Sequence, residues 1–143
     1  TCCAGSNTTS ATTGGGGTSG DTDERFAGAA KTMTREPLPN RRDNRYVTIV
    51  WRGALVTVCV GVRDDGRAAE MFADGWKAGS DMQAVIEDGC VAASHLAQMG
   101  RTFAEQARSV GRDEAGQPTS IMGRIIDAAA ALEAEEAKTG PRP

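Results

Sequence analysis

Hydrophobic and polar residues alternate along two neighbouring segments, and this period of two predicts two β-strands. In the first strand Val47, Ile49 and Trp51 share one face, and the Arg52-Gly53 turn then reverses the chain. In the second strand one face carries only valine, while Leu55, Thr57 and Cys59 share the other; the valines are Val56, Val58, Val60 and Val62. Because β-branched side chains pack well on a pleated surface, this run favours the centre of a sheet.

A third strand is predicted from roughly Ala68 to Ala73. The preceding Asp64-Asp65-Gly66 supplies residues that tolerate positive φ, which indicates a tight hairpin. Order is expected to begin at Pro37-Leu38-Pro39, because the residue before each proline is driven out of the helical region. The three strands together form an antiparallel meander.

The pattern then changes to helical spacing. Ser80 with Gln83 three residues later fits a capping box, and Gly100 marks the end of this first helix. We expect one apolar face to point inward, made of Met82, Val85, Ile86, Gly89, Ala93 and Leu96.

Two further helices are predicted. Thr102 with Glu105 repeats the capping pattern and starts a short helix that ends at about Val110. The last helix runs from about Ile121 to Ala137, with an inner side made of Ile125, Ile126, Ala129 and Leu132. The predicted fold class is therefore α+β: a small antiparallel three-stranded meander packed against about three helices.

Residues 1–36 differ from the rest in composition, because Thr, Ser and Gly dominate them. Such a segment buries too little apolar surface to offset the entropy of ordering, so we expect a flexible, disordered leader. The remaining chain divides into a folded α+β domain, 37–138, and a C-terminal tail, 139–143. A chain of 143 residues with this leader leaves one small core.

Charge and cysteine content restrict the function classes. The net charge of −3 argues against a general nucleic-acid binder, and no apolar run is long enough to cross a membrane, so a cytoplasmic protein is expected. The cysteines Cys2, Cys3, Cys59 and Cys90 lack the spacing of a zinc or dithiol site. Neither a metal, a cofactor nor a catalytic residue is predicted.

The sequence predicts one candidate anion-binding site, at the start of the first helix. Lys77, Gly79 and Ser80 flank the start of a helix, where an ammonium, a hydroxyl and free backbone N–H groups are able to meet a phosphate. Arg41 and Arg42 add forked contacts if their segment crosses the same edge of the sheet. The structural alternative is that Ser80 only caps the helix and the arginines form a solvated turn.

Three other features have structural alternatives of their own. Arg67 is a further candidate for the anion, but on the simpler interpretation it pairs with Glu70 or Asp64 at the surface. His95 is the only histidine and has no cysteine at a useful spacing. The tryptophans, Trp51 and Trp76, are able to stack on a base but are most simply core or interface anchors.

Five motifs in order resemble the TSCPD domain family, which is found near the C-terminus of vitamin B12-dependent ribonucleotide reductases and as short proteins of bacteria and phages. The similarity covers residues 37 to about 132, and its motifs are Leu38-Pro39-Asn40-Arg41-Arg42, the Gly53 hairpin, Asp65-Gly66-Arg67 with Glu70-Met71-Phe72, Lys77-Ala78-Gly79-Ser80, and Ser94 to Gly100. The string Thr-Ser-Cys-Pro-Asp itself, the cysteine-rich tail and the reductase barrel are absent.

The resemblance implies a non-catalytic accessory or regulatory module of the ribonucleotide reductase system, which binds a nucleotide or another phosphate-bearing ligand. Its expected partners are that ligand, a reductase large subunit and further copies of the chain in a homo-oligomer; neither a membrane nor nucleic acid is expected. Two alternatives remain open: a stand-alone oligomeric module that sequesters a nucleotide signal or docks on a protein, and a fragment of a ribonucleoside-diphosphate reductase.

Overall fold

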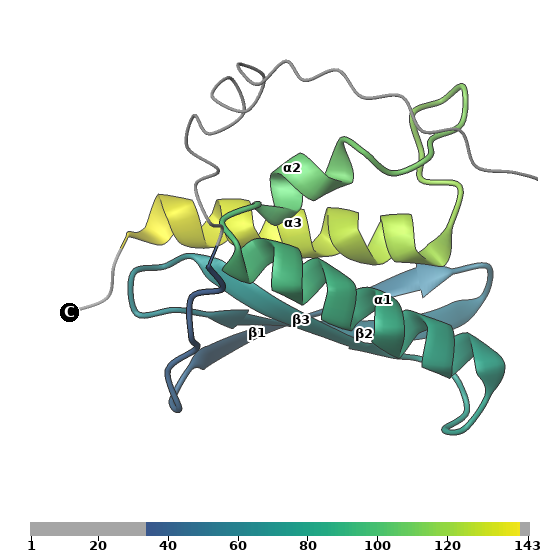
Figure 1. The fold of residues 1–143 in the computed structure, drawn as a ribbon. Coiled ribbons are helices and arrows are strands. Elements are labelled where there is room, and N and C mark those ends of the chain that lie inside the picture. Colours follow the sequence, from purple (N-terminus) through teal and green to yellow (C-terminus); the bar gives the residue numbers. More distant parts are fainter. Residues whose placement is uncertain (1–33, 141–143) are drawn as a thin grey trace, which may run out of the picture. The chain divides into compact units, whose positions relative to one another are not determined.

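The structure is a computed structural model that describes residues 34–140. Three strands form one antiparallel sheet in the order β1-β2-β3, and all three helices lie on the same face of that sheet (Figure 1). The elements are β1 (Asp43–Trp51), β2 (Ala54–Val62), β3 (Ala68–Asp74), α1 (Asp81–Gln98), α2 (Phe103–Ala107) and α3 (Ile121–Thr139). The predicted α+β meander with three helices is confirmed. Most of the expected leader and the end of the tail, with Cys2 and Cys3, lie outside the described residues.

Strand β2 occupies the centre of the sheet, as its valines predict. It pairs with β1 from Asp43↔Val62 to Trp51↔Ala54, and with β3 from Thr57↔Asp74 to Val62↔Ala68. The four valines are at most 4% exposed and lie beneath the helices. The turn between β1 and β2 has positive φ at both central residues, Arg52 and Gly53, which matches the twist of a two-residue hairpin.

The core lies between the sheet and the helices. Helix α1 covers β3, while α3 contacts both β1 and β2 and holds α2. Phe103, at the start of α2, is completely buried together with Ile86 of α1 and Ile125 of α3. The predicted inner side of α3 is confirmed, because Ile125, Ile126 and Ala129 are buried and Leu132 packs against the core.

The inner face predicted for α1 is partly wrong. Met82, Val85 and Leu96 are 44%, 59% and 46% exposed, whereas three polar side chains of the helix are buried: Gln83, Ser94 and Gln98. These three meet the outer edge of β3. The Ser94 hydroxyl accepts a hydrogen bond from the Met71 N–H at 2.9 Å, and the Gln83 and Gln98 amides donate to the Ala73 and Ala69 carbonyls at 3.2 and 3.1 Å.

Helix α1 therefore takes the place of a fourth strand along β3. A sheet edge exposes unpaired backbone groups, and covering the edge with a helix is one way to satisfy them. Apolar periodicity alone could not identify this face, because the polar side chains that bind the edge are buried beside Ile86 and Cys90.

The helix termini follow the predicted caps with two differences. The Ser80 side chain accepts from the Gln83 N–H, but the Gln83 side chain does not return the bond and accepts from the Trp76 N–H instead. Thr102 and Glu105 form the complete capping box. Helix α2 ends at Ala107 rather than near Val110, and the Arg112 guanidinium donates a 2.8 Å hydrogen bond to the Ala107 carbonyl.

Candidate functional site

The predicted anion-binding residues lie in two groups at opposite ends of the sheet. Arg41 and Arg42 precede Asp43, which pairs with Val62, whereas Lys77 follows Asp74, which pairs with Thr57. Val62 and Thr57 are five residues apart on β2, about 16 Å at the rise of an extended strand. The segment before β1 thus crosses the end of the sheet away from α1's first turn. The condition under which Arg41 and Arg42 would join Lys77 and Ser80 at one phosphate, a shared edge of the sheet, is therefore not met.

At the first end a cleft of about 500 Å³ contains three arginines and three acids. We call it the arginine cleft; its charged lining residues are Arg41, Arg42, Arg63, Asp43, Asp64 and Glu136. The two signs balance in number, so the cleft is not a strongly cationic pocket.

Arg42 is held by a buried acid. Its Nε donates to Glu70 Oε1 at 2.5 Å and its Nη1 donates to the Pro39 carbonyl at 2.7 Å. Glu70 is only 7% exposed, and a Cβ at Gly61 would lie 2.6 Å from Glu70 Cγ. The glycine therefore leaves room for the acid to cross β2 and reach Arg42, which makes Arg42 a structural residue.

Arg63 and Arg67 fasten the segment before β1. Arg63 donates to the Glu36 and Pro37 carbonyls at 2.9 and 3.0 Å, and its side chain is 9% exposed. Arg67 pairs with Asp65 at 2.7 Å and with Glu36 at 3.1 Å. The surface-pair interpretation of Arg67 gave the correct kind of contact, but the partners are Asp65 and Glu36 rather than Glu70 or Asp64.

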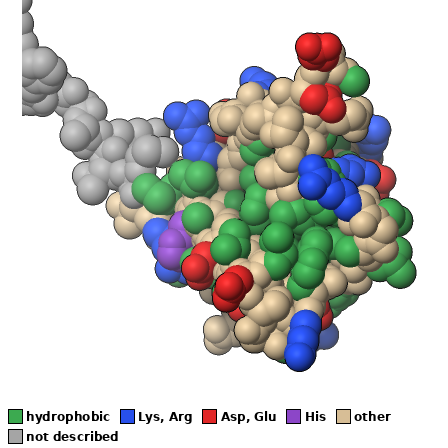
Figure 2. Space-filling model, turned by 90° about the vertical axis from the view of Figure 1, so that its right-hand side faces the viewer, with side chains coloured by type: hydrophobic (Ala, Val, Ile, Leu, Met, Phe, Trp, Pro, Cys, Tyr) green, Lys and Arg blue, Asp and Glu red, His purple; other side chains and the backbone are tan. Residues whose placement is uncertain are grey.

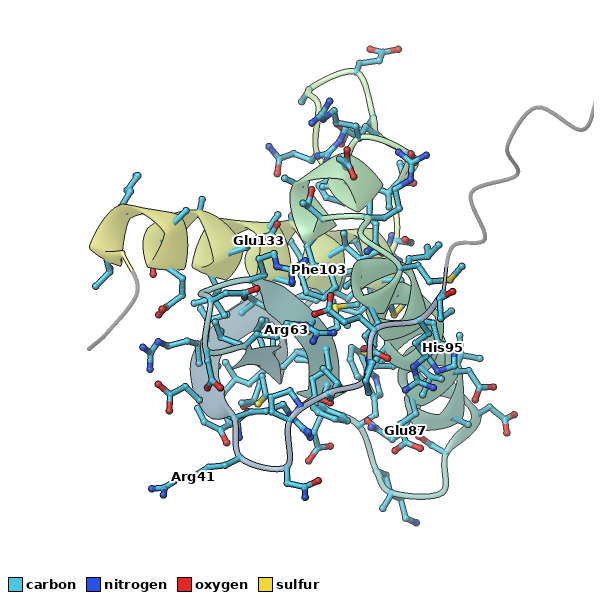
Figure 3. The ribbon with its side chains drawn as sticks, turned by 60° about the vertical axis from the view of Figure 1, so that its left-hand side comes forward. Arg41, Arg63, Glu87, His95, Phe103 and Glu133 are labelled. Carbon is cyan, nitrogen blue, oxygen red and sulfur yellow. The ribbon has the colours of Figure 1, made fainter. Side chains whose placement is uncertain are left out.

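Arg41 is the exception among the arginines that line the cleft. Within residues 34–140 it makes no hydrogen bond or ion pair, and its side chain extends away from the ribbon, whereas Arg63 lies against it (Figure 3). Among the described arginines of the cleft, Arg41 alone therefore has a free guanidinium.

At the other end Lys77, Gly79 and Ser80 form the turn into α1. Gly79 adopts φ 78°, a conformation that glycine enters without strain, and the Ser80 N–H donates to the Lys77 carbonyl at 3.0 Å. The Ser80 hydroxyl is occupied by the Gln83 N–H, so it acts as the cap. Lys77 is exposed and has no partner in the described part of the chain.

The face of the sheet opposite the helices carries large exposed side chains, and we call it the open face. Tyr46, Val50, Leu55 and Phe72 are 65%, 63%, 67% and 54% exposed. Hydrophobic side chains also gather at the end of the molecule that carries the β1–β2 turn and the loop before α1, with charged groups around them (Figure 2). The sequence pattern assigned Leu55, Thr57 and Cys59 to this face without indicating that it stays uncovered.

A groove of about 680 Å³ runs between the open face and α1. We call it the open-face groove; it is lined by Tyr46, Thr57, Cys59, Phe72, Ala73, Asp74, Ala78, Gln83, Glu87, Cys90 and Val91. Two aromatic rings and two carboxylates line it, and no Lys or Arg does. Ala78 joins it to the Lys77–Ser80 turn. The sequence analysis missed this groove, because its residues come from three strands, the loop before α1 and α1 itself.

The two cysteines of the groove are poor nucleophiles. Burial raises the pKa of the Cys90 thiol to about 11, against the opposing effect of a hydrogen bond with the Ala73 backbone. Burial also raises the pKa of Cys59, although its contact with Tyr46 acts in the other direction. Both thiols are protonated at neutral pH, and protonated thiols attack slowly.

No catalytic or metal constellation appears among residues 34–140. No group of three or more His, Cys, Asp or Glu side chains in this part of the chain is placed to hold a metal ion. His95 is exposed near the end of α1, on the helix that also carries Glu87 (Figure 3). None of the described helices is both long and apolar enough to cross a membrane.

Comparisons with protein-family models, curated proteins and solved structures found no match to this chain.

Proposed function

We propose that this protein is a non-catalytic module that binds a nucleotide, with the base in the open-face groove and the phosphate at the Lys77–Ser80 turn. The observation that carries the proposal is the junction at Ala78, which lines the groove and lies between Lys77 and Gly79. The exposed aromatic rings of the groove and the proposed phosphate-binding turn are thereby adjacent.

The groove has the size and lining for a base. Its volume of about 680 Å³ falls within the range of small-molecule sites. Tyr46 and Phe72 present exposed rings, and stacking of a base on one aromatic ring contributes about 1 to 3 kcal/mol. The Asp74 and Glu87 carboxylates are acceptors suited to ribose hydroxyls or to amino groups of a base.

The Lys77–Ser80 turn supplies positively polarised groups that are complementary to a phosphate. The first N–H groups of an α-helix lack intrahelical partners, and the positive end of the helix dipole lies there. Lys77 brings an ammonium that no described residue neutralises. The arginine cleft lies at the other end of the sheet from the Lys77–Ser80 turn, too far to contact a phosphate there.

Calorimetry with ribonucleotides and deoxyribonucleotides tests the proposal. Lys77→Ala is expected to weaken binding by about 1 to 3 kcal/mol without changing stability, because it removes a charge-assisted contact. Arg41→Ala is the matched control, since Arg41 is also an exposed cation without a described partner but lies at the opposite end. Equal loss of binding in both variants, or no heat with any nucleotide, overturns the proposal.

A second pair of variants tests the base. Phe72→Ala is expected to weaken nucleotide binding by about 1 to 3 kcal/mol. Leu55→Ala is the control, because Leu55 is similarly exposed on the open face but does not line the groove. If Leu55→Ala weakens binding as much as Phe72→Ala, the ligand does not sit in the groove.

The link to ribonucleotide reductase rests on the motif resemblance alone and stays a prediction. A pull-down with a reductase large subunit tests it separately from nucleotide binding. Retention of the subunit by the wild-type chain supports an accessory role, and its absence alongside nucleotide binding favours the stand-alone signal-binding alternative.

A further inference from the structure

We infer that two copies of this chain pair through their β1 strands, antiparallel and edge to edge, so that two three-stranded sheets join into one of six strands. The inference is independent of the nucleotide site. It starts from a difference between the two edges of the sheet.

The β3 edge is closed and the β1 edge is not. Side chains of α1 bind the backbone of β3 at Ala69, Met71 and Ala73. Beyond its pairing with β2, the backbone of β1 makes no hydrogen bond to any residue in the described range 34–140. Since neighbouring residues of a strand point their N–H and C=O groups to opposite sides, about half of the β1 residues present unpaired groups outward.

Strand β1 carries few of the features that keep edges apart: its charged residues are Asp43 at its start and Arg45, which pairs with Glu136. It has nine residues, more than the ~5 to 6 of an average strand, and contains neither proline, lysine nor glycine. Its register with β2 is continuous, and the only irregularity of the sheet lies between Gly61 and Val62, toward β3. A long, regular, unprotected edge is a template for another strand.

The sequence of β1 complements itself about Thr48. A two-fold axis through this residue pairs Thr48 with its own copy, Tyr46 with Val50, and Arg45 with Trp51. Thr–Thr and aromatic–β-branched pairs are favourable across strands. The Arg45 guanidinium already pairs with Glu136 of its own copy, and the Trp51 ring already carries the Arg52 guanidinium at 5.3 Å from its centroid. The third pair therefore adds packing of the arginine stem rather than a new cation–π contact.

The register that is centred on Val47 is less favourable. An axis through Val47 pairs Asp43 with Trp51 and sets Arg42 opposite Arg52, two like charges. An axis between two residues would turn the core face of one strand to the open face of the other. The charges therefore favour the axis through Thr48 over the axis through Val47.

The helices leave room for this pairing. Helix α3 contacts both β1 and β2, so it lies over the boundary between them. With strands about 4.8 Å apart, the two copies of α3 approach to about 10 Å, which is close to the distance of packed helices. Val47 and Trp51, which are core-facing residues only partly buried in one copy, would gain cover from the second.

Analytical ultracentrifugation of the full chain from about 1 µM to about 1 mM tests the inference. The wild type is expected to form a dimer. Thr48→Lys places two ammonium groups opposite each other at the axis and is expected to raise the dimer dissociation constant at least about tenfold. Thr57→Lys is the matched control, because Thr57 pairs with Thr48, is also exposed on the open face, and lies on the central strand.

The register is tested by disulfide trapping in a chain with Cys2, Cys3 and Cys59 replaced by serine. Directly paired residues have Cα separations within the range of a disulfide, so Thr48→Cys is expected to cross-link with its own copy. The single variant Val50→Cys is not expected to cross-link. The double variant with Tyr46→Cys and Val50→Cys is expected to cross-link, because these two positions face each other across the axis. A wild type that stays monomeric overturns the inference, and so does a dimer that Thr57→Lys disrupts and Thr48→Lys leaves intact. Circular dichroism melting checks that each variant is folded.

Discussion

The Ser94 hydroxyl on α1 accepts a 2.9 Å hydrogen bond from the backbone N–H of Met71 on β3. The same oxygen lies 2.7 Å from the Cys90 carbonyl and 3.3 Å from the Met71 carbonyl, either of which accepts its proton. One buried side chain thus connects a helix to the edge of the sheet and satisfies a backbone group that otherwise would have no partner.

Replacement of Ser94 by alanine is expected to lower the free energy of unfolding by about 1 to 3 kcal/mol, because the Met71 N–H stays buried without an acceptor. Urea denaturation measures the loss. Ser109→Ala is the control, since Ser109 is exposed and only its backbone is hydrogen-bonded. Equal stability of the Ser94 and Ser109 variants would show that this contact with the edge of β3 does not stabilise the fold.

Arg42→Ala is expected to destabilise the fold by about 3 kcal/mol, because it leaves the buried Glu70 carboxylate without its partner. The double variant Arg42→Ala/Glu70→Gln is expected to recover part of the loss, since a neutral amide is less costly to bury than a carboxylate. Thermal unfolding of both variants measures the coupling. Arg41→Ala is expected to change stability little, and a comparable loss there would contradict the structural role of Arg42.

Cys90 is expected to resist a thiol reagent at pH 8 in the folded protein, because its pKa is raised to about 11 and the residue is buried. In a chain with Cys2 and Cys3 replaced by serine, Cys59 is expected to be labelled before Cys90, since Cys59 is only partly buried. Mass spectrometry after timed labelling distinguishes the two thiols. Rapid labelling of Cys90 without denaturant would show that α1 opens readily from β3.

Acid is expected to weaken the β2–β3 turn slightly. Burial raises the pKa of Asp65, but hydrogen bonds from the Arg67 backbone and guanidinium, with the charges of Arg67 and Arg63, lower it overall below its usual value. A carboxyl with a lowered folded-state pKa stabilises the fold above its unfolded pKa, and this contribution disappears as the pH falls through the folded value.

The Asp65 contribution is expected to stay below about 1 kcal/mol, because the side chain is 49% exposed and its ion pair is screened by water. Wild type and Asp65→Asn are therefore expected to differ slightly in stability near pH 7 and to converge near pH 2. The Asn variant retains a side-chain acceptor for the Arg67 N–H but loses the charge. A difference that persists unchanged at low pH would show that it does not come from the charge of Asp65.

Much of the fold was predictable because its signals are local. The alternation in β1 and β2, the all-valine face of β2, the Gly53 and Gly66 turns and the caps at Ser80 and Thr102 depend on residues within a few positions of each other. The strand pairings and the order of elements followed from these, because short hairpins leave few other arrangements.

The candidate site was predicted less well because it depends on distance across the sheet. Sequence motifs identified Arg42 and Lys77 but not that they lie at opposite ends, nor that Glu70 binds Arg42 through the space above Gly61. The aromatic residues of the groove, Tyr46 and Phe72, are separated in sequence, so no local spacing connects them.

By itself, the sequence determined which segments become strands and helices and which valines are buried on the central strand, because side-chain spacing fixes the faces of regular elements. Only the tertiary structure decided which of those faces is covered. The helices all pack on one side, α1 turns polar side chains to β3 because an edge needs hydrogen bonds, and the described residues leave the outer edge of β1 and much of the open face uncovered. Which faces and edges are covered depends on how elements distant in sequence pack together, and no local pattern encodes that packing.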